Sequence, residues 1–541
     1  MNDNVKKIIV VVAIILIGLL ITAFYFMFKD SNNNTSITST EAITEVNENN
    51  DATILDDVDW SSYSTETINL EKSVTISKAG VYEINGTLEN GSITINTKGN
   101  VKLILNNVTI NNSNGAAIIV ENADVTYIEI VGDNKITATV NDEQDAAIYS
   151  SDDLILLGDG KLTINSNLDA IASKDDLMII SGTYNINADD DGIRGKDSLY
   201  IKGGTFNIET KGNGIKTTNE EKGSIYIESG SFNITSYLDG IQSVSAITIK
   251  DGTFNIESGK NNSSSSDSTK GIKATSNILI ENGKFNITSV DDALHSNSAI
   301  EIKNGEFIIF SSDDGMHADN TISIKGGTIN ITKSYEGIEA NYIIIDDGDI
   351  KVVSTDDGIN VSGGSNQTGN NRMDEFADNG GYLKINGGTI YVNANGDGLD
   401  SNGSIYMTNG YVSVDGPTNS GNGALDYNGE FVISGGTLIA VGSSGMAENV
   451  SSNSTQTTIQ INLDSNTTGK IEFAGITYTP TKSYQNIIIS SSTLELNKEY
   501  KLLINNATYS TYTLTQTITS SGNSNGMNQG SMMQGGMRGR R

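Results

Sequence analysis

The sequence predicts an all-β fold, a right-handed parallel β-helix, and two observations carry this prediction. A unit of about 22 residues repeats along the chain, for instance at Asp190–Thr210 (DDGIRGKDSLYIKGGTFNIET) and at Asp291–Ser311 (DDALHSNSAIEIKNGEFIIFS). Each unit also divides into three short segments in which alternate residues are apolar, as expected of strands with one buried face. A repeat this short and regular indicates a solenoid with three strands in each coil.

Two other all-β architectures are less compatible with this period. A propeller blade needs four strands and about 40 residues, and β-sandwiches do not repeat at this spacing. In the β-helix, one position of the third segment is aromatic and predicts an inward stack of rings from Tyr184, Phe206, Phe232, Phe254, Phe285 and Phe307. The Asn residues beside it, such as Asn207 and Asn255, face outward, where they either form an amide ladder or present donors to a sugar chain.

The N-terminal residues 1–29 predict the location of the protein. Ile8–Phe28 is an uncharged run that is long enough to span a bilayer, and Lys6 and Lys7 precede it. We expect a single-pass membrane anchor that leaves the C-terminal part outside the cell. A cleaved signal sequence, which would give a secreted protein, is the alternative.

The remaining chain divides by composition into four parts. Residues 30–62 are rich in Asn, Ser, Thr and Glu and predict a flexible linker. The coils are expected at 63–450, with degenerate repeats at their ends, and are followed by a C-terminal β cap at 451–519. Residues 520–541 form a low-complexity stretch and predict a disordered tail.

Composition excludes several classes of function. The chain of 541 residues has no Cys, which excludes disulfides, thiolate metal sites and a Cys nucleophile. Its net charge of −32 makes nucleic acid an unsuitable partner and cations suitable ones. We expect the exported part to be a monomer.

An acidic turn precedes the first segment of most repeats, and in several repeats the acid is doubled. Stacked coils lie about 4.8 Å apart, so a column of carboxylates repels itself unless something offsets the charge. Ca²⁺ binds carboxylate and carbonyl oxygens and would do so. We therefore expect calcium ligands among Asp190, Asp191, Asp239, Asp291, Asp292, Asp313, Asp314, Asp356 and Asp357. The alternative is that each Asp caps its own turn, which explains single acids but not doubled ones.

A second column lies two residues after the small residue of each turn and faces outward. It changes from basic to acidic along the chain and places the two His residues of the protein in adjacent coils. Insertions at Asn219–Gly223 and Gly363–Gly380 leave from the turn after this strand and would flank it. A strip of this kind suits a linear polymer, and we expect its contacts at Lys273, His295, His317, Glu339 and Arg372.

The repeated DDGI…GG-T-F-N-I pattern, over about Thr65–Val441, resembles the carbohydrate-binding β-helix family of clostridia and relatives. The fold of that family is similar to the calcium-dependent pectate lyases. The resemblance implies calcium at the Asp turns and affinity for plant or cell-surface polysaccharides, including acidic ones, but it implies no cleavage. Lyases of this kind need a Lys or Arg base near the calcium site, and Arg194, Lys196, Lys216 and Lys273 are the nearest residues.

We therefore expect a cell-surface, calcium-stabilised protein that binds acidic or plant-type polysaccharides, and we assign no catalytic residue. A calcium-dependent polysaccharide lyase acting on uronate-containing polymers is one alternative, and a structural adhesin is another. Trp60 is the one Trp of the chain and is expected to lie outside the coils. This disfavours stacking on crystalline cellulose and favours hydrogen bonding and calcium bridging.

Overall fold

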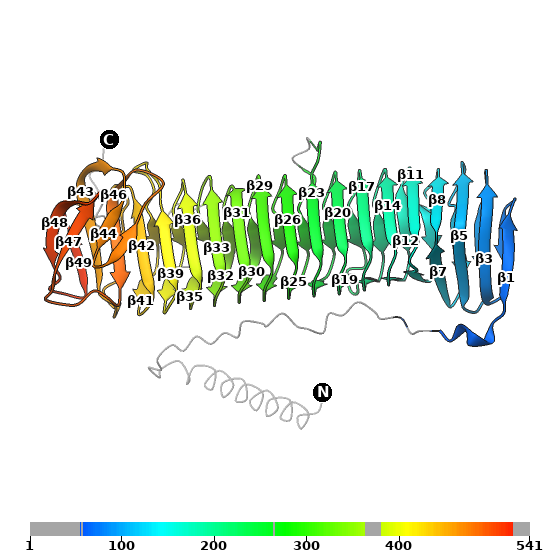
Figure 1. Ribbon diagram of the computed structural model, residues 1–541, viewed down its shortest axis with the longest axis horizontal. Coiled ribbons are helices and arrows are strands. Elements are labelled where there is room, and N and C mark those ends of the chain that lie inside the picture. Colours follow the sequence, from blue (N-terminus) through cyan, green and yellow to red (C-terminus); the bar gives the residue numbers. More distant parts are fainter. Residues whose placement is uncertain (1–54, 56–57, 263–265, 363–379, 523–541) are drawn as a thin grey trace, which may run out of the picture. The chain divides into compact units, whose positions relative to one another are not determined.

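The computed structural model describes residues 55, 58–262, 266–362 and 380–522. Of the two compact units into which the chain separates, Met1–Glu45 lies wholly outside the described residues, and Val46–Arg541 holds the described strands. The predicted parallel β-helix is confirmed. Strands of successive coils pair in parallel and follow one another along one axis, from β1 (Thr65–Leu70) to β42 (Thr437–Gly442) (Figure 1).

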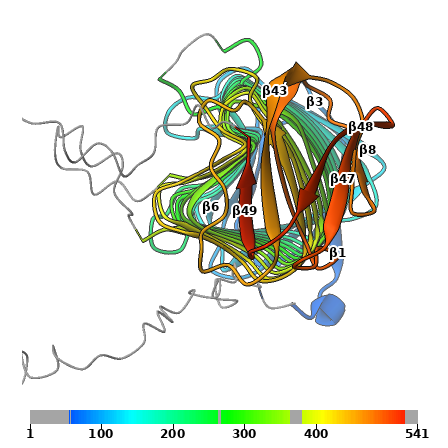
Figure 2. The same cartoon turned by 90° about the vertical axis from the view of Figure 1, so that its left-hand side faces the viewer.

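Each coil contributes one strand to each of three faces. Viewed along the axis, the strands of one face lie over one another (Figure 2). The first face follows the acidic turn and contains β2 (Val74–Ile76), β4 (Ile93–Asn96), β6 (Ile118–Asn122), β9 (Ala146–Ser150), β12 (Asp169–Ser173), β15 (Ile193–Gly195), β18 (Ile215–Thr217), β21 (Ile241–Ser243), β24 (Ile272–Ala274), β27 (Leu294–Ser296), β34 (Ile359–Val361), β37 (Leu399–Ser401) and β40 (Leu425–Tyr427).

The second face contains β1, β7 (Val125–Val131), β10 (Asp153–Leu157), β13 (Asp176–Ile179), β16 (Ser198–Ile201), β19 (Ser224–Ile227), β22 (Ile247–Ile249), β25 (Asn277–Ile280), β28 (Ala299–Ile302), β35 (Tyr382–Ile385), β38 (Ser404–Met407) and β41 (Phe431–Ile433). Two long strands, β30 (Met316–Ile324) and β32 (Ile338–Ile345), run through both the first and the second face.

The third face contains β8 (Asp133–Ala138), β11 (Lys161–Ser166), β14 (Thr183–Ala188), β17 (Thr205–Thr210), β20 (Ser231–Ser236), β23 (Thr253–Ser258), β26 (Lys284–Ser289), β29 (Glu306–Ser311), β31 (Thr328–Ser334), β33 (Asp349–Ser354), β36 (Thr389–Ala394), β39 (Tyr411–Asp415) and β42. Near the N-terminal end, β3 (Gly80–Leu88) and β5 (Val101–Asn112) run through both the second and the third face.

The predicted aromatic stack fills the core under the third face. Neighbouring rings from Tyr184 to Phe307 lie 4.6–5.1 Å apart between centroids, and their planes are within 7° of parallel. The turn before each ring requires glycine. At Gly252, where φ is +142°, a Cβ atom would lie 2.8 Å from the Phe254 ring and 3.1 Å from the carbonyl oxygen of Gly230 in the preceding coil.

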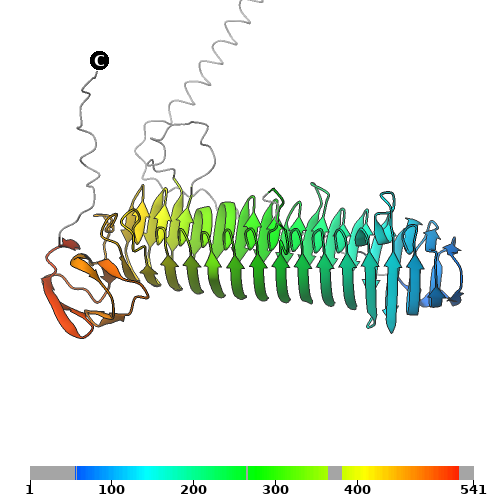
Figure 3. The ribbon, with the colours of Figure 1, turned by 90° about the horizontal axis from the view of Figure 1, so that it is seen from above.

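The C-terminal strands leave the coil pattern and cover the end of the solenoid (Figure 3). β46 (Tyr484–Ser491) pairs antiparallel with both β42 and β43 (Thr458–Thr467), and β49 (Ile518–Ser521) pairs with β43. A separate four-stranded sheet contains β44 (Ile471–Phe473), β45 (Ile476–Tyr478), β47 (Glu499–Ile504) and β48 (Ala507–Thr513).

One buried carboxylate joins this end to the coils. Asp415 is 0% exposed and accepts hydrogen bonds from the hydroxyls of Tyr391 (3.1 Å) and Tyr478 (2.7 Å) and from the backbone N–H of Thr481 (2.8 Å). Because a buried carboxylate is costly unless it is fully hydrogen-bonded, these contacts fix the cap on the last coils.

The segment before the first coil packs on the second face, which the sequence did not lead us to expect. Trp60, in the short 3-10 helix η2 (Trp60–Ser62), lies 5.2 Å from the Tyr127 ring, and the backbone N–H of Val58 donates to the Tyr127 hydroxyl. Trp60 therefore contacts the coils. Within the described residues, no helix is long and apolar enough to cross a bilayer, and the predicted anchor Ile8–Phe28 lies outside them.

The ring stack gives a test of the core. Replacing Phe254, which is 0% exposed, by Ala should lower the free energy of unfolding by about 3–5 kcal/mol, because it removes a buried ring and leaves a cavity. Replacing its outward neighbour Asn255 by Ala should cost about 1 kcal/mol or less, since its amide contact with Asn286 is long at 3.5 Å. Chemical denaturation followed by circular dichroism measures both. Equal losses would contradict the inward assignment of the ring.

Candidate functional site

A column of polar side chains runs along the first face, one from each coil, and we call it the first-face column. Strand pairing confirms its predicted alignment, because each member lies opposite the next in register. Its members are Arg194, Lys216, Gln242, Lys273, His295, His317, Glu339, Asn360, Asp400 and Asp426. Most are partly exposed, whereas Arg194 and Asn360 are buried.

The turn acids beside this column form a ladder along the axis. In most of these acids, one carboxylate oxygen accepts a hydrogen bond from a backbone N–H in the next coil. Examples are the N–H of Asp191 to Asp169 Oδ1 (3.0 Å), of Asp314 to Asp292 Oδ1 (3.1 Å) and of Asp397 to Asp357 Oδ1 (2.6 Å). The turn acid therefore joins successive coils, which is a structural role that the sequence analysis did not assign.

In the coils before Glu339, the other oxygen of the turn acid faces a basic side chain. Asp169 Oδ2 lies 2.6 Å from Arg194 Nε, and the same guanidinium reaches Asp145 at 2.7 Å. Asp191 Oδ2 lies 3.4 Å from Lys216 Nζ. These contacts pair the upstream acids with the chain's own cations, although burial still raises the pKa of Asp169 to about 7.

Lys270 neutralises the doubled acid of the central coils. Its Nζ lies 2.6 Å from Asp291 and 3.0 Å from Asp292, and Asp292 also lies 2.8 Å from His295 Nδ1. Burial alone would raise the pKa of Asp292, but its hydrogen bonds with His295 and the charge of Lys270 hold the pKa down at about 2.

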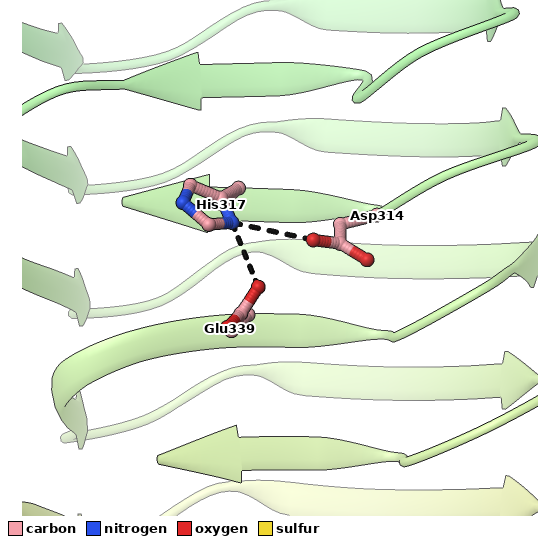
Figure 4. A group of neighbouring side chains, drawn as sticks. All are labelled: Asp314, His317 and Glu339. Carbon is pink, nitrogen blue, oxygen red and sulfur yellow. Dashed lines mark hydrogen bonds and ion pairs between the residues drawn. The ribbon is translucent and has the colours of Figure 1, made fainter. Parts of the chain in front are cut away.

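The two His residues stack one coil apart, as predicted. Their ring centroids are 5.1 Å apart, and the ring planes differ by 11°. His317 Nδ1 lies between two carboxylates, 2.8 Å from Glu339 Oε2 and 3.2 Å from Asp314 Oδ2 (Figure 4). Burial opposes the charged imidazole, but these two hydrogen bonds raise the pKa of His317 to about 11, so His317 is a cation at neutral pH.

After Glu339 the first-face column is acidic at Asp400 and Asp426, and the turn acids Glu336, Asp357 and Asp397 lie beside it. Within the described residues, no ion pair joins these acids to a basic side chain. Burial and mutual repulsion raise the pKa of Glu336 to about 8, of Asp357 to about 6, of Asp397 to about 7 and of Asp400 to about 8. Asn360 lies among them and is 7% exposed; its Nδ2 donates to Glu336 (2.7 Å), but its buried Oδ1 has no partner. This part of the column is an oxygen-rich site without its own cation.

The predicted ligand residues fall into separate groups. Oxygens of Asp190 and Asp191 meet those of Asp169, and oxygens of Asp291 and Asp292 meet those of Asp313, in each case within 4.8 Å. Asp314 instead groups with His317 and Glu339. Asp239 is separate: it is 1% exposed and accepts from the backbone N–H of Lys270 (2.7 Å), with Lys273 Nζ at 4.0 Å.

The remaining predicted residues, Arg372, Asp356 and Asp357, belong to none of these groups. Arg372 and most of the Gly363–Gly380 insertion lie outside the described residues. Asp356 and Asp357 lie at the start of the acidic part of the column.

Sequence reasoning missed two features of this site. It did not anticipate Lys270 as the partner of Asp291 and Asp292, nor a further acidic group of Asp153, Asp175 and Asp176 at the turn between the first and second faces. A usable signal was the spacing of three residues between Asp292 and His295 and between Asp314 and His317, since it brings an acid and a base together across the turn.

Comparison with known proteins identifies the family. The family of carbohydrate-binding domain-containing proteins matches residues 70–315 and 312–535, most of the chain. The chain belongs to this family. The predicted resemblance to a carbohydrate-binding family is thereby confirmed.

Two proteins illustrate what the chain is similar to. A carbohydrate-binding domain-containing protein of Acetivibrio thermocellus is 34% identical over 141 residues, which are 24% of this chain and 47% of that relative. The chain thus spans less than half of the relative's length. A solved structure, the polysaccharide lyase-like protein from C. thermocellum as its gadolinium derivative, shares 24% identity, covers 50% of this chain and 91% of that chain, and has a TM-score of 0.29.

The raised pKa of His317 can be measured directly, because the chain has two His residues and their NMR signals are separable. The His317 imidazole should stay protonated at pH 8. Replacing Glu339 by Gln should lower its midpoint by about 1–3 pH units, because one of two bonded carboxylates is lost. Replacing Asp319, which lies 3.4 Å from Nε2 and whose side chain is 59% exposed, by Asn should change it little. A midpoint near 6.5 in the parent protein would contradict the ion-pair assignment.

Proposed function

We propose that this protein is a calcium-stabilised polysaccharide-binding protein of the cell surface, and that the polysaccharide lies along the first-face column. The observation that carries the proposal is the column itself. It presents one polar side chain per coil, about 4.8 Å apart, in a chain of a carbohydrate-binding family. A linear polymer repeats its hydroxyl and carboxylate groups along its length, so a linear array of donors and acceptors matches it.

The first-face column has a positively charged upstream part and a negatively charged downstream part, and we assign a different role in binding to each. Lys216, Lys273 and the protonated His317 offer positive charge to sugar carboxylates upstream. Downstream, Asp400 and Asp426 repel acidic sugars unless a cation lies between them and the glycan. Acidic or plant-type glycans are therefore the proposed ligands, with calcium bridging at the acidic end.

The acidic part of the column also supplies the donor set that calcium prefers. Upstream, Arg194, Lys216 and Lys270 pair with turn acids, which reduces the repulsion that a metal ion would have to offset there. Downstream, Asn360, whose buried Oδ1 is unpartnered, lies in register between the half-buried carboxylates of Glu339 and Asp400, and both kinds of group are calcium ligands. Bound calcium would neutralise this cluster. Its proposed ligands are Glu336, Asp357, Asn360 and Asp400.

Binding is favoured over cleavage by the state of the basic residues. A lyase base must release its proton near neutral pH. Burial opposes the charged forms of Arg194 and Lys270, but neighbouring carboxylates nevertheless raise the pKa of each. Lys216 and Lys273 also face carboxylates, at 3.4 and 4.0 Å. Arg194 and Lys270 are thus held in their protonated forms.

The surface location rests on the sequence of Ile8–Phe28, an uncharged run after Lys6 and Lys7. Fractionation of cells that express the full chain tests it. Recovery of the protein in the membrane fraction is expected, whereas a shortened protein in the medium would instead indicate a cleaved signal sequence.

Calcium binding predicts a particular dependence of stability on pH. Because Glu336 and Asp400 have higher pKa values in the folded protein, about 8 each, than in the unfolded chain, the folded state binds more protons. In chelator, the melting temperature should therefore fall by a few degrees as the pH rises from about 4 to about 8. Calcium should reverse the fall at pH 8 and have little effect at pH 5, where the carboxylates hold protons.

A matched pair of variants locates the effect. Asp400→Asn should flatten the pH dependence in chelator and weaken the response to calcium, whereas Asp349→Asn, at an exposed position on the third face, should do neither. Equal stabilisation by calcium at pH 5 and pH 8, or no metal by elemental analysis, would contradict the proposed site.

Glycan binding can be assigned to the column by a conservative double change. Gln occupies the column at Gln242, so His295→Gln with His317→Gln keeps a residue that the fold already accepts there. We expect about tenfold weaker binding of acidic oligosaccharides on a glycan array, because a cation is lost. Lys501→Gln, which removes an exposed cation from cap strand β47, is the control. Unchanged affinity would remove the column from the site, and release of an unsaturated product by the parent protein would establish a lyase.

A further inference from the structure

Exposed apolar side chains gather on two neighbouring coils of the third face and at the turns beside it. Val290, Ile308, Phe310 and Tyr335 are 48%, 54%, 40% and 47% exposed. Ile308 and Phe310 belong to β29, which lies between β26 and β31 near the middle of the solenoid (Figure 1). We call these four residues the apolar patch.

Each member on β29 stands where the adjacent coils have polar residues. Ile308 lies in register between Asn286 and Asn330, in the column of the amide ladder. Phe310 lies in register between Thr288 and Lys333. The repeat thus changes from polar to apolar at two exposed positions of a single strand.

Tyr335 makes a comparable change at the adjoining turn. Its backbone N–H donates to the carbonyl of Asp313, and its carbonyl accepts from the N–H of Asp356, which places it in the column of the outer turn acids. Its hydroxyl hydrogen-bonds to Asp356, whose charge raises the pKa of Tyr335 to about 12. An aromatic ring therefore replaces an acid beside the turn that leads to Glu339.

Folding does not account for these changes. Side chains that remain about half exposed remove little apolar area from water. Where the amide ladder forms, the Nδ2 of one coil donates to the Oδ1 of the coil before it, as Asn207 does to Asn185 at 3.0 Å. Ile308 can neither donate to Asn286 nor accept from Asn330, so the polar residue of the repeat would serve the fold better at this position.

We propose that the apolar patch is a second polysaccharide-binding surface, which stacks on the apolar face of a pyranose ring; this inference rests on the proposed function. Phe310 and Tyr335 supply aromatic surface, which packs against a flat partner at low entropy cost. Lys333 Nζ lies 4.9 Å from the Phe310 ring centroid and provides a cation for a sugar hydroxyl or carboxylate. Asn286 and Asn330 flank the patch with amide groups, so apolar and polar contacts alternate as in the sugar itself.

The position of the patch connects it to the first-face column. The chain passes from Phe310 through the turn at Asp313 and Asp314 to His317, so the two surfaces lie on either side of one acidic turn. A polymer that lies along the first-face column therefore passes the patch at this turn, where a sugar unit or branch that reaches around the turn meets both surfaces.

The test restores the residues of the repeat, which protects the fold. In one variant, Ile308→Asn is combined with Phe310→Thr, so that both positions match the preceding coil. In a second, Tyr335→Leu removes a ring and keeps an apolar side chain. Tyr411→Thr is the control, because Tyr411 is 38% exposed on the same face and lies in register with Thr389 and Thr437. Circular dichroism and the melting temperature check that all variants fold.

Affinity is measured by titration calorimetry with cellohexaose and with a galacturonic acid hexamer. We expect the double variant to bind the sugar that the parent binds about tenfold more weakly, Tyr335→Leu to bind it several-fold more weakly, and Tyr411→Thr to match the parent. If the parent binds and the double variant matches it, the patch proposal is overturned and the proposed function stands. If the parent binds neither sugar, both fail.

A second copy of the chain is the competing occupant of an apolar surface. Sedimentation velocity distinguishes it, because a parent dimer that the double variant converts to a monomer would overturn the glycan assignment. A monomeric parent that loses sugar affinity in the double variant supports it.

Discussion

Every side chain in the coils has a counterpart about 4.8 Å away in the coil before it and in the coil after it. This spacing rewards columns of apolar residues, and the rings from Tyr184 to Phe307 stack at 4.6–5.1 Å as a result. The same spacing penalises columns of like charge. The way in which the charge of the turn acids is offset therefore decides which polar groups of the first-face column are available to a ligand.

The two oxygens of a turn acid offset its charge in different ways. One oxygen accepts a backbone N–H from the next coil, as Asp292 does from Asp314, and the other binds a base, as Asp292 does with His295 and Lys270. Among the described residues, the last base of the column is His317, which lies between Asp314 and Glu339. Beyond this point, the same turn geometry continues with acids whose pKa values are raised, to about 7 at Asp397 and about 8 at Asp400.

The fold was predictable because it depends on local repetition. The period, the aromatic position and the register that sets His295 over His317 are all visible in the sequence, since each coil repeats the contacts of the last. The acid–base pairs at Asp292/His295 and Asp314/His317 are suggested by their spacing, but the pairing of Lys270 with Asp291 was not visible, because it depends on how a side chain reaches across a turn. Lys270 follows a long turn after Ser258 that breaks the period, so its place beside Asp291 could not be read from alignment.

Contacts between residues far apart in the chain were also beyond the repeat. Trp60 packs on Tyr127, and Asp415 binds Tyr478 in the cap, and neither pair belongs to a repeated position. In such cases the sequence carries composition but no register, and a polar or aromatic residue outside the coils has no copies to compare with. The predicted ligands and glycan contacts stay predictions for a related reason: alignment places their side chains but not their partners.

A repeat protein provides its own reference for judging which residues serve binding. Each His ring binds a turn acid through Nδ1, just as Arg194 binds Asp169 and Lys216 faces Asp191 upstream. The fold therefore explains the Nδ1 contacts of both rings. Glycan contact by these residues would use the opposite edge of the ring, where His295 Nε2 meets Asn297. Ile308 has no such explanation, since it interrupts the amide ladder between Asn286 and Asn330 and is 54% exposed. A departure from the repeat that gives up polar contacts and is exposed to solvent is the stronger sign of a binding surface, because the fold would otherwise favour the residue of the repeat.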